Sequence, residues 1–214
     1  MRFVFLVILT GALFLPIAGQ ALDVSDVPHV SNNTRKSIAK DYERSRSQET
    51  YMLAVSTTGF WGATASGRGE TGDLVRGALQ KCEHAAQTRC GMAAVSGENV
   101  EFREYPPQIR YVRELDLNSI PFIWTKGRNR LKRDYIDQGE NRALVLSRNG
   151  GYGFAYDRSS PDAAVEKAMS KCTKNGKRAC FVYEVNGKVV FNRETDRWKS
   201  TRLNSSHRTT SYAV

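Results

Sequence analysis

The order of hydrophobic and polar positions occurs twice along the chain. Residues 51–102 pass through two short apolar stretches, an amphipathic stretch that reaches a cysteine, and two further apolar stretches, and residues 142–191 repeat this order. Self-similarity at a fixed distance is typical of duplicated structural units. The pattern therefore predicts an α+β fold of two small tandem units, each built as helix, hairpin, helix and hairpin.

Hairpins are expected where two apolar stretches flank tight-turn residues. The clearest signal is Asn149-Gly150, because Asn and Gly both tolerate the positive φ of a two-residue turn. Asn186-Gly187 is a second such signal, whereas the first unit has Thr58 at the place of Asn149. The expected strand pairs are 52–56 with 61–66, 91–96 with 99–103, 143–147 with 152–156, and 181–185 with 188–192.

Helices are expected at residues 34–46, 72–82 and 161–172, and around residues 131–135. The helices before the cysteine loops have apolar side chains along one face and are expected to end at Cys82 and Cys172. Ser160 is placed to cap the later of these two helices. Thr71 is placed to cap the earlier one, where Asp73 suits the positive end of the helix dipole.

The four cysteines form two pairs of equal spacing. Cys82 and Cys90 have the same separation as Cys172 and Cys180, so duplication of a local bond predicts the disulfides Cys82–Cys90 and Cys172–Cys180. By the chain-entropy relation, closing so short a loop contributes about 2 to 3 kcal/mol to stability. A zinc site is disfavoured because closely spaced ligand pairs are missing and only His84 lies near the cysteines. No metal and no cofactor are expected.

The first residues have the pattern of an export signal. Residues 1–21 begin with a positive charge, continue with an apolar run and end with small residues, which predicts a signal peptide cleaved near Ala21. A membrane anchor is the alternative, but Gly11 and Pro16 interrupt a run that is shorter than the roughly 20 residues of a spanning helix. The mature protein is therefore expected in the periplasm or outside the cell, without a membrane span, where disulfides persist.

The two ends of the remaining chain are expected to lie outside the fold. Residues 22–33 are polar without a period and predict a loose lead-in. Residues 199–214 have no acidic residue and resemble a peptide translated from adapter sequence, so they are a suspected non-native tail. Without Arg2 and the basic residues of this tail, the formal net charge of +10 falls to about +6. The protein is basic by either count.

The two units are expected at residues 34–103 and 128–192, with residues 104–127 as a linker. Two adjacent prolines mark a break in this linker. Its apolar group at residues 120–124 is too hydrophobic for a free loop and is expected to pack between the units. The alternative is a surface for a partner.

Four residues at matching places in the two units are candidate ligand contacts. Trp61 and Tyr152 are aromatic residues beside glycines, and Arg68 and Arg158 lie between hairpin and helix. The arginines could receive an anionic group, and the aromatic rings could contact a sugar or a peptide. The favoured interpretations are instead arginines that are only solvated and rings that only cover a hairpin. A basic run at residues 126–133 could contact nucleic acid or anionic lipid, but export argues against nucleic acid.

Catalytic chemistry has little support in the sequence. His29, His84 and His207 are not placed to act as the base of a nucleophilic triad. No Gly-Lys-Ser/Thr follows the glycines at residues 67–69, so they do not form a phosphate-binding loop. No catalytic residue is expected, although a pair of carboxylates that cleaves glycosidic bonds stays open as an alternative.

The order of these motifs resembles a known family. The succession of apolar strand, glycine with an aromatic residue and glycine, second strand, Ala-rich helix reaching a cysteine, short loop, cysteine and strand is similar to the secreted bacterial domain-of-unknown-function family 4189. The resemblance covers residues 34–192, taken as two copies. It implies an exported domain with a local disulfide and no established activity, and it supplies no catalytic residue.

These observations predict an exported, non-enzymatic binding or envelope-associated protein, whose partner is an envelope protein or an anionic or saccharide ligand. One alternative is a small carboxylate-dependent hydrolase of cell-wall or extracellular material. Another is an inhibitor or structural protein that docks on an envelope enzyme through residues 120–124. A hydrolase requires an acidic cleft between the units, whereas a binding protein requires an exposed aromatic or basic face.

Overall fold

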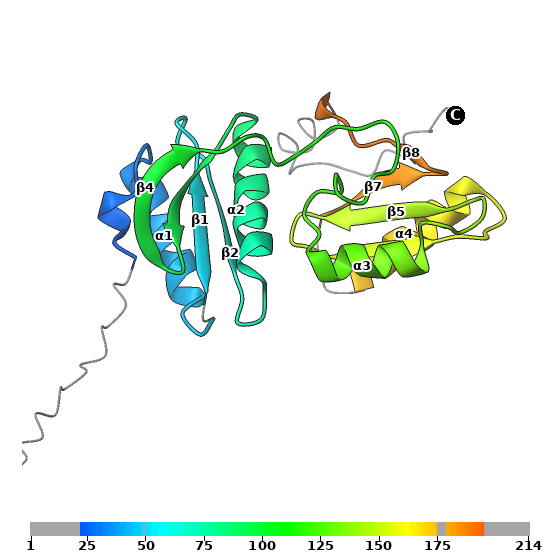
Figure 1. The fold of residues 1–214 in the computed structure, drawn as a ribbon, viewed down its shortest axis with the longest axis horizontal. Helices are drawn as coiled ribbons and strands as arrows, with labels where there is room; N and C mark the ends of the chain where they lie inside the picture. Colours follow the sequence, from blue (N-terminus) through cyan, green and yellow to red (C-terminus); the bar gives the residue numbers. More distant parts are fainter. Residues whose placement is uncertain (1–21, 49, 175–178, 195–214) are drawn as a thin grey trace, which may run out of the picture.

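The computed structural model describes residues 22–48, 50–174 and 179–194. The described residues form a mixed α/β fold with two antiparallel sheets, four α-helices and two disulfides (Figure 1). The α+β class is therefore confirmed. The predicted signal peptide at residues 1–21 and the suspected tail at residues 199–214 lie outside the described residues.

The N-terminal half contains the first sheet. Its strands are β1 (Tyr51–Val55), β2 (Trp61–Ala65), β3 (Gly91–Val95) and β4 (Glu98–Glu104), in the order β2-β1-β3-β4. One face packs against helix α1 (Asn32–Arg44) and the short 3₁₀ helix η1 (Val24–Asp26), and the other face packs against α2 (Thr71–Ala86). Successive side chains of β1 point to opposite faces of the sheet, so Leu53 packs on the α1 side and Met52 packs on the α2 side.

The C-terminal half contains the second sheet. Its strands are β5 (Ala143–Ser147), β6 (Tyr152–Ala155), β7 (Cys180–Val185) and β8 (Lys188–Val189), in the order β6-β5-β7-β8. Helix α4 (Pro161–Lys174) covers one face. Helix α3 (Thr125–Asp134) and the connecting segment, residues 105–124, cover the other (Figure 1). The fold therefore places a sheet between helical layers in each half.

The expected strands agree with the observed ones to within one or two residues at most ends, but two helix predictions are wrong. Helix α2 continues to Ala86 and α4 to Lys174, both past the cysteines at which they were expected to end. In α2 the residues after Cys82 are good helix formers, and the helix stops only at Gln87, which adopts a left-handed φ of 55°. Strand β8 is also shorter than expected, since it ends at Val189.

Both disulfides join a helix to the strand that follows it. Cys82 is bonded to Cys90, with a Cα–Cα distance of 6.2 Å, and Cys172 to Cys180, with a Cα–Cα distance of 6.4 Å. The pairing predicted from equal spacing is confirmed. Each bond fixes the last turns of the helix to the start of an inner strand of its own sheet, β3 or β7.

The loose lead-in predicted for residues 22–33 is wrong. Leu22, Val27 and Val30 are all buried and belong to the core between α1 and the first sheet. The polar residues between them are mostly exposed. The segment therefore packs on the first half through these three apolar side chains. A periodic pattern was missing because irregular backbone buries residues without a fixed spacing.

The glycines beside Trp61 and Tyr152 have a structural role. A Cβ at Gly62 would overlap the backbone of α2, and a Cβ at Gly153 would overlap the backbone of α4. Both helices therefore approach their sheets at a position where only glycine fits. The glycine-aromatic motif is explained by this close packing without any ligand.

The apolar group at residues 120–124 is largely buried, as expected. Ile120, Phe122 and Ile123 are exposed by 0, 4 and 2%. The Phe122 ring lies 6.3 Å from His84 of α2 and 6.2 Å from Phe181 of β7, so it packs between the two halves. These residues are consequently not the exposed docking patch of the inhibitor alternative.

Polar side chains of α2 hold the connecting segment in place. Arg76 donates to the carbonyl of Ile120 at 2.8 Å, and Gln80 accepts from the backbone N–H of Phe122 at 2.7 Å. Asp73 accepts from the backbone N–H of Thr125 at 2.7 Å.

Thr71 does not cap α2 as expected, because the helix begins after Glu70 and has no side-chain cap. Ser160 does cap α4, since its Oγ accepts from the N–H of Ala163 at 3.2 Å.

Candidate functional site

The four predicted ligand-contact residues do not form one site. Trp61 and Tyr152 lie on outer strands of different sheets, and Arg68 and Arg158 are exposed in the turns before α2 and α4. Trp61 packs against the core under α1, which fits the covering role that was its alternative. Only Tyr152 lines one of the hollows described below.

The first hollow lies at the start of α3 and is called the α3 hollow here. It has a volume of about 340 Å³. Tyr152 closes one side, and its ring fits over α3 because Gly127 has no side chain: a Cβ there would lie 3.2 Å from Cε1 of Tyr152. The lining residues are Ile123, Trp124, Lys126, Gly127, Arg130, Arg133, Gly150 and Tyr152.

Tyr152 is the first of three aromatic rings along the outer strand β6. The rings of Tyr152 and Phe154 lie 6.5 Å apart and those of Phe154 and Tyr156 lie 6.4 Å apart, each pair with an interplanar angle of 13°. All three rings are partly exposed, and they alternate along the strand so that they share one face. We call them the aromatic row. At the matching positions of β2, Trp61 is followed by Ala63 and Ala65, so only the second sheet has such a row.

Basic side chains surround the hollow. Lys126, Arg130 and Arg133 are exposed on α3. Asp134 pairs with Arg133 at 2.7 Å and with Arg130 at 3.4 Å, and the hydrogen bond from Arg133 lowers the pKa of Asp134. One carboxylate therefore faces three cations, which leaves the hollow with a positive charge.

Further positive charge lies beside the aromatic row. Lys171 of α4 donates to the carbonyl of Phe154 at 2.8 Å, and its Nζ lies 5.3 Å from the centre of the Phe154 ring. Partial burial lowers the pKa of Lys171, and the positive charges of Arg158, Lys167 and Arg130 lower it further. Arg158 thus belongs to the same positive region as Arg130, although it does not line the hollow.

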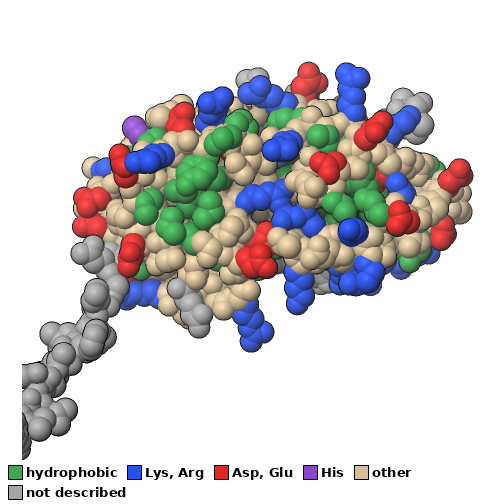
Figure 2. Space-filling model, in the orientation of Figure 1, with side chains coloured by type: hydrophobic (Ala, Val, Ile, Leu, Met, Phe, Trp, Pro, Cys, Tyr) green, Lys and Arg blue, Asp and Glu red, His purple; other side chains and the backbone are tan. Residues whose placement is uncertain are grey.

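The positive charge of the protein is concentrated in this half. Residues 128–192 contain thirteen Lys and Arg against seven Asp and Glu, a net charge of +6, whereas residues 34–103 contain ten against eight, a net charge of +2. Figure 2 shows lysine and arginine side chains gathered along the lower edge of the half that contains α3. An asymmetry of this kind raises the local concentration of anions near the α3 hollow.

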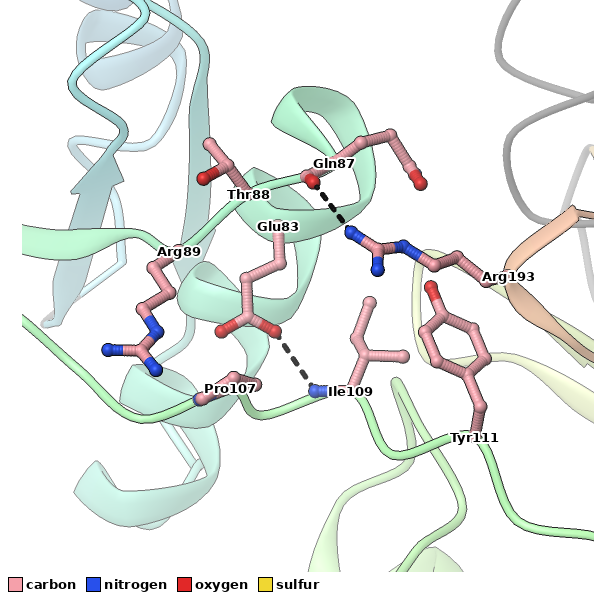
Figure 3. A pocket seen from close by; sticks show the side chains of 8 residues that line it. All are labelled: Glu83, Gln87, Thr88, Arg89, Pro107, Ile109, Tyr111 and Arg193. Atoms are coloured by element: carbon pink, nitrogen blue, oxygen red, sulfur yellow. Dashed lines mark hydrogen bonds between the residues drawn. The ribbon is translucent and has the colours of Figure 1, made fainter.

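The second hollow lies between the two halves and is called the groove here (Figure 3). Its volume is about 430 Å³. Three parts of the chain line it: the end of α2 with the disulfide loop, the connecting segment, and the residues after β8. The lining residues are Glu83, Gln87, Thr88, Arg89, Pro107, Ile109, Tyr111 and Arg193.

Glu83 forms the polar floor of the groove. Its carboxylate accepts from the backbone N–H groups of Gln108 and Ile109, each at 2.9 Å, and therefore ties the connecting segment to α2. Burial raises the pKa of Glu83 above its ordinary value, while these hydrogen bonds act in the opposite direction. The sequence offered no signal for this role, because the partners are backbone groups far along the chain.

A buried glutamate in the second sheet is a structural group. Glu184 is fully buried and accepts from the hydroxyl of Tyr135 and the N–H of Gly187, with Arg142 at 3.7 Å. Burial raises the pKa of Glu184. The set links the end of α3 to the turn between β7 and β8, and within it the side chains of Glu184 and Tyr135 are fully buried.

In the described part of the chain, no group of three or more His, Cys, Asp or Glu is arranged to hold a metal ion. Within residues 22–48, 50–174 and 179–194, no helix has the length and apolar character needed to cross a membrane. Of the described residues that line the α3 hollow and the groove, only Glu83 has a carboxylate.

No family model, curated protein or solved structure matches the chain.

Proposed function

We propose that this protein is exported and consists of two tandem units that arose by duplication, each of them a copy of the domain that its motifs resemble. The two disulfides support an oxidising compartment outside the cytoplasm, since such bonds rarely persist in the cytosol. The same strand order in both sheets, with each disulfide following its second helix, supports the duplication.

Within this frame, the protein is a non-enzymatic binding protein for an acidic saccharide of the cell envelope or the exterior. The observation that carries the proposal is the α3 hollow, which combines Lys126, Arg130 and Arg133 with the ring of Tyr152. Pockets of a few hundred cubic ångströms with aromatic walls and a few charged groups are the usual form of a ligand site.

The side chains of the α3 hollow and of the aromatic row match the chemical groups of an acidic saccharide. The rings of the aromatic row pack partly against the core of the second half, and their exposed parts offer apolar surface against which a sugar ring can lie. The two tyrosines of the row add hydroxyl groups for hydrogen bonds. Lysine and arginine side chains at the hollow are placed to pair with carboxylate or sulfate groups of the same ligand. A neutral saccharide would satisfy only the aromatic half of this surface.

A hydrolase is less well supported. Glycosidases use two carboxyl groups that flank the scissile bond. Among the described residues, Glu83 is the only carboxylate that lines the groove, and its oxygens accept two backbone N–H groups. The groove therefore lacks the acidic character that a carboxylate-dependent hydrolase requires.

The proposal is tested by titration of the full chain, exported to the periplasm and purified there, with oligogalacturonate and with a neutral maltooligosaccharide of equal length. We expect calorimetry to detect binding of the acidic sugar only. The double variant K126Q/R130Q should weaken this binding about tenfold, because a factor of ten corresponds to about 1.4 kcal/mol and two exposed ion pairs supply about that much.

The matched control is K36Q/K40Q, which removes two exposed lysines from α1 and should leave the affinity unchanged. Equal binding of the neutral sugar, or an equal loss in the control variant, contradicts the proposed site. Release of shorter sugars during the titration would instead support the hydrolase.

A further inference from the structure

The groove between the halves has the features of a second ligand site, separate from the α3 hollow. Its volume of about 430 Å³ is large enough for a small molecule. It is lined by residues that are distant in sequence, such as Thr88 in the disulfide loop and Arg193 after β8. A ligand held there would contact both halves at once.

The walls of the groove are held in place before any ligand arrives. The Cys82–Cys90 disulfide closes the loop that carries Thr88 and Arg89. On the opposite wall, the ring of Tyr111 packs against Phe191 at 5.4 Å. Preorganised walls lower the entropy cost of binding.

The charges of the groove favour an anion at each side. Figure 3 shows Arg89 and Arg193 on opposite sides of Glu83, and both arginines are exposed. Arg193 donates to the carbonyl of Gln87 at 3.5 Å, which is the long limit of a hydrogen bond, and the guanidinium of Arg89 forms no hydrogen bond or ion pair with the described residues. Both guanidinium groups are therefore available to pair with an acidic ligand.

The space between the two arginines is mostly apolar. Pro107 and Ile109 lie there in Figure 3, and the Glu83 carboxylate beside them is engaged by backbone N–H groups of the connecting segment. An apolar chain laid there would exclude water mainly from Pro107, which is exposed, since Ile109 is only 7% exposed. Tyr111 and Thr88 add hydroxyl groups at the rim.

We propose that the groove binds a small linear molecule with an acidic group at each end and an apolar middle, of the dicarboxylate class. One carboxylate pairs with Arg89 and the other with Arg193, and the apolar middle covers Pro107 and Ile109. Two ends are needed because the arginines lie on different halves of the molecule. Binding therefore joins the disulfide loop of the first half to the end of the second.

The test uses the full exported chain and unbranched dicarboxylates of four to ten carbons, with monocarboxylates and diols of the same lengths as controls. We expect calorimetry to show a maximum of affinity at one length of diacid, at least tenfold above the monoacid, and a rise in melting temperature with that diacid. R89Q and R193Q should each reduce the affinity of the diacid about tenfold and bring it close to that of the monoacid.

Two variants separate this site from other causes. R68Q removes an exposed arginine of the first half that does not line the groove, and it should leave diacid binding unchanged. K36Q/K40Q should also leave diacid binding unchanged. Because the groove shares no lining residue with the α3 hollow, failure of the saccharide proposal does not affect this one. Absence of diacid binding up to 10 mM, equal affinity for monoacids and diacids, or an equal loss in R68Q would overturn the inference.

Discussion

At the scale of single residues, the two buried glutamates show how burial and hydrogen bonds set the pKa of a side chain. Glu83 and Glu184 both have raised pKa values, and burial is the largest cause for each. Each accepts hydrogen bonds from backbone N–H groups, and Glu184 also accepts one from the Tyr135 hydroxyl.

These two residues predict a pH dependence of stability. A carboxyl group with a raised pKa binds more protons in the folded than in the unfolded protein, so its contribution is complete below the ordinary pKa of about 4.5 and is lost as the pH rises through the raised value. We expect the free energy of unfolding in urea to fall between pH 4.5 and pH 7 relative to that of the variant E83Q/E184Q. A difference between the two proteins that stays constant, or that grows in favour of the native chain, would show that burial does not dominate.

At the scale of elements, close contact between helix and sheet decides where glycine is required. Gly62 and Gly153 lie where the backbones of α2 and α4 meet the outer strands, whereas Gly72 on the surface of α2 has no neighbouring atom within 4 Å of a Cβ built on it. The lysines that precede Cys82 and Cys172 complete the contact. Lys81 donates to the carbonyl of Ala63 and Lys171 to that of Phe154, each at 2.8 Å.

Alanine substitutions test this requirement directly. G62A and G153A should each lower the free energy of unfolding by about 1 to 3 kcal/mol, because the added methyl group forces helix and sheet apart. G72A is the matched control and should raise stability by up to about 1 kcal/mol, since alanine is the better helix former. Urea unfolding followed by circular dichroism measures all three, and a tolerated G153A would refute the close-packing explanation.

At the scale of the whole molecule, the connecting segment joins the two halves. Phe122 contacts a ring from each half, and Arg76 and Gln80 of α2 bond to the backbone around it. Phe122 adopts a positive φ of 62°, a conformation that is rare for a bulky residue and is maintained here by its surroundings. The segment is therefore part of the core and not a flexible tether.

Truncation of this ring should uncouple the halves. F122A is expected to lower the free energy of unfolding by about 3 to 5 kcal/mol and to divide one thermal transition into two, because the halves lose their shared contact. The control F60A removes a phenylalanine that is 49% exposed and should change stability by less than about 0.5 kcal/mol. Differential scanning calorimetry distinguishes the outcomes, and one sharp transition in F122A would mean that the hydrogen bonds from α2 to the connecting segment suffice to couple the halves.

The sequence by itself determined the local structure and its covalent links. Apolar alternation and Asn-Gly turns predicted most strands to within two residues, and the equal spacing of the cysteines predicted both disulfides, since these features depend on neighbours along the chain. Periodicity also predicted which faces are buried. The burial of residues 120–124 followed from composition alone.

Only the tertiary structure decided which distant residues meet. The anchors at residues 22–30, the hydrogen bonds of Glu83 and the joining of Arg89 and Arg193 in one groove depend on contacts between segments that no local pattern links. The same is true of the α3 hollow, where Tyr152 meets the basic side chains of α3 only because the sheet brings β6 beside that helix. Local propensity acts over a few residues, whereas a binding surface is made by packing, and so its residues are known only once the fold is formed.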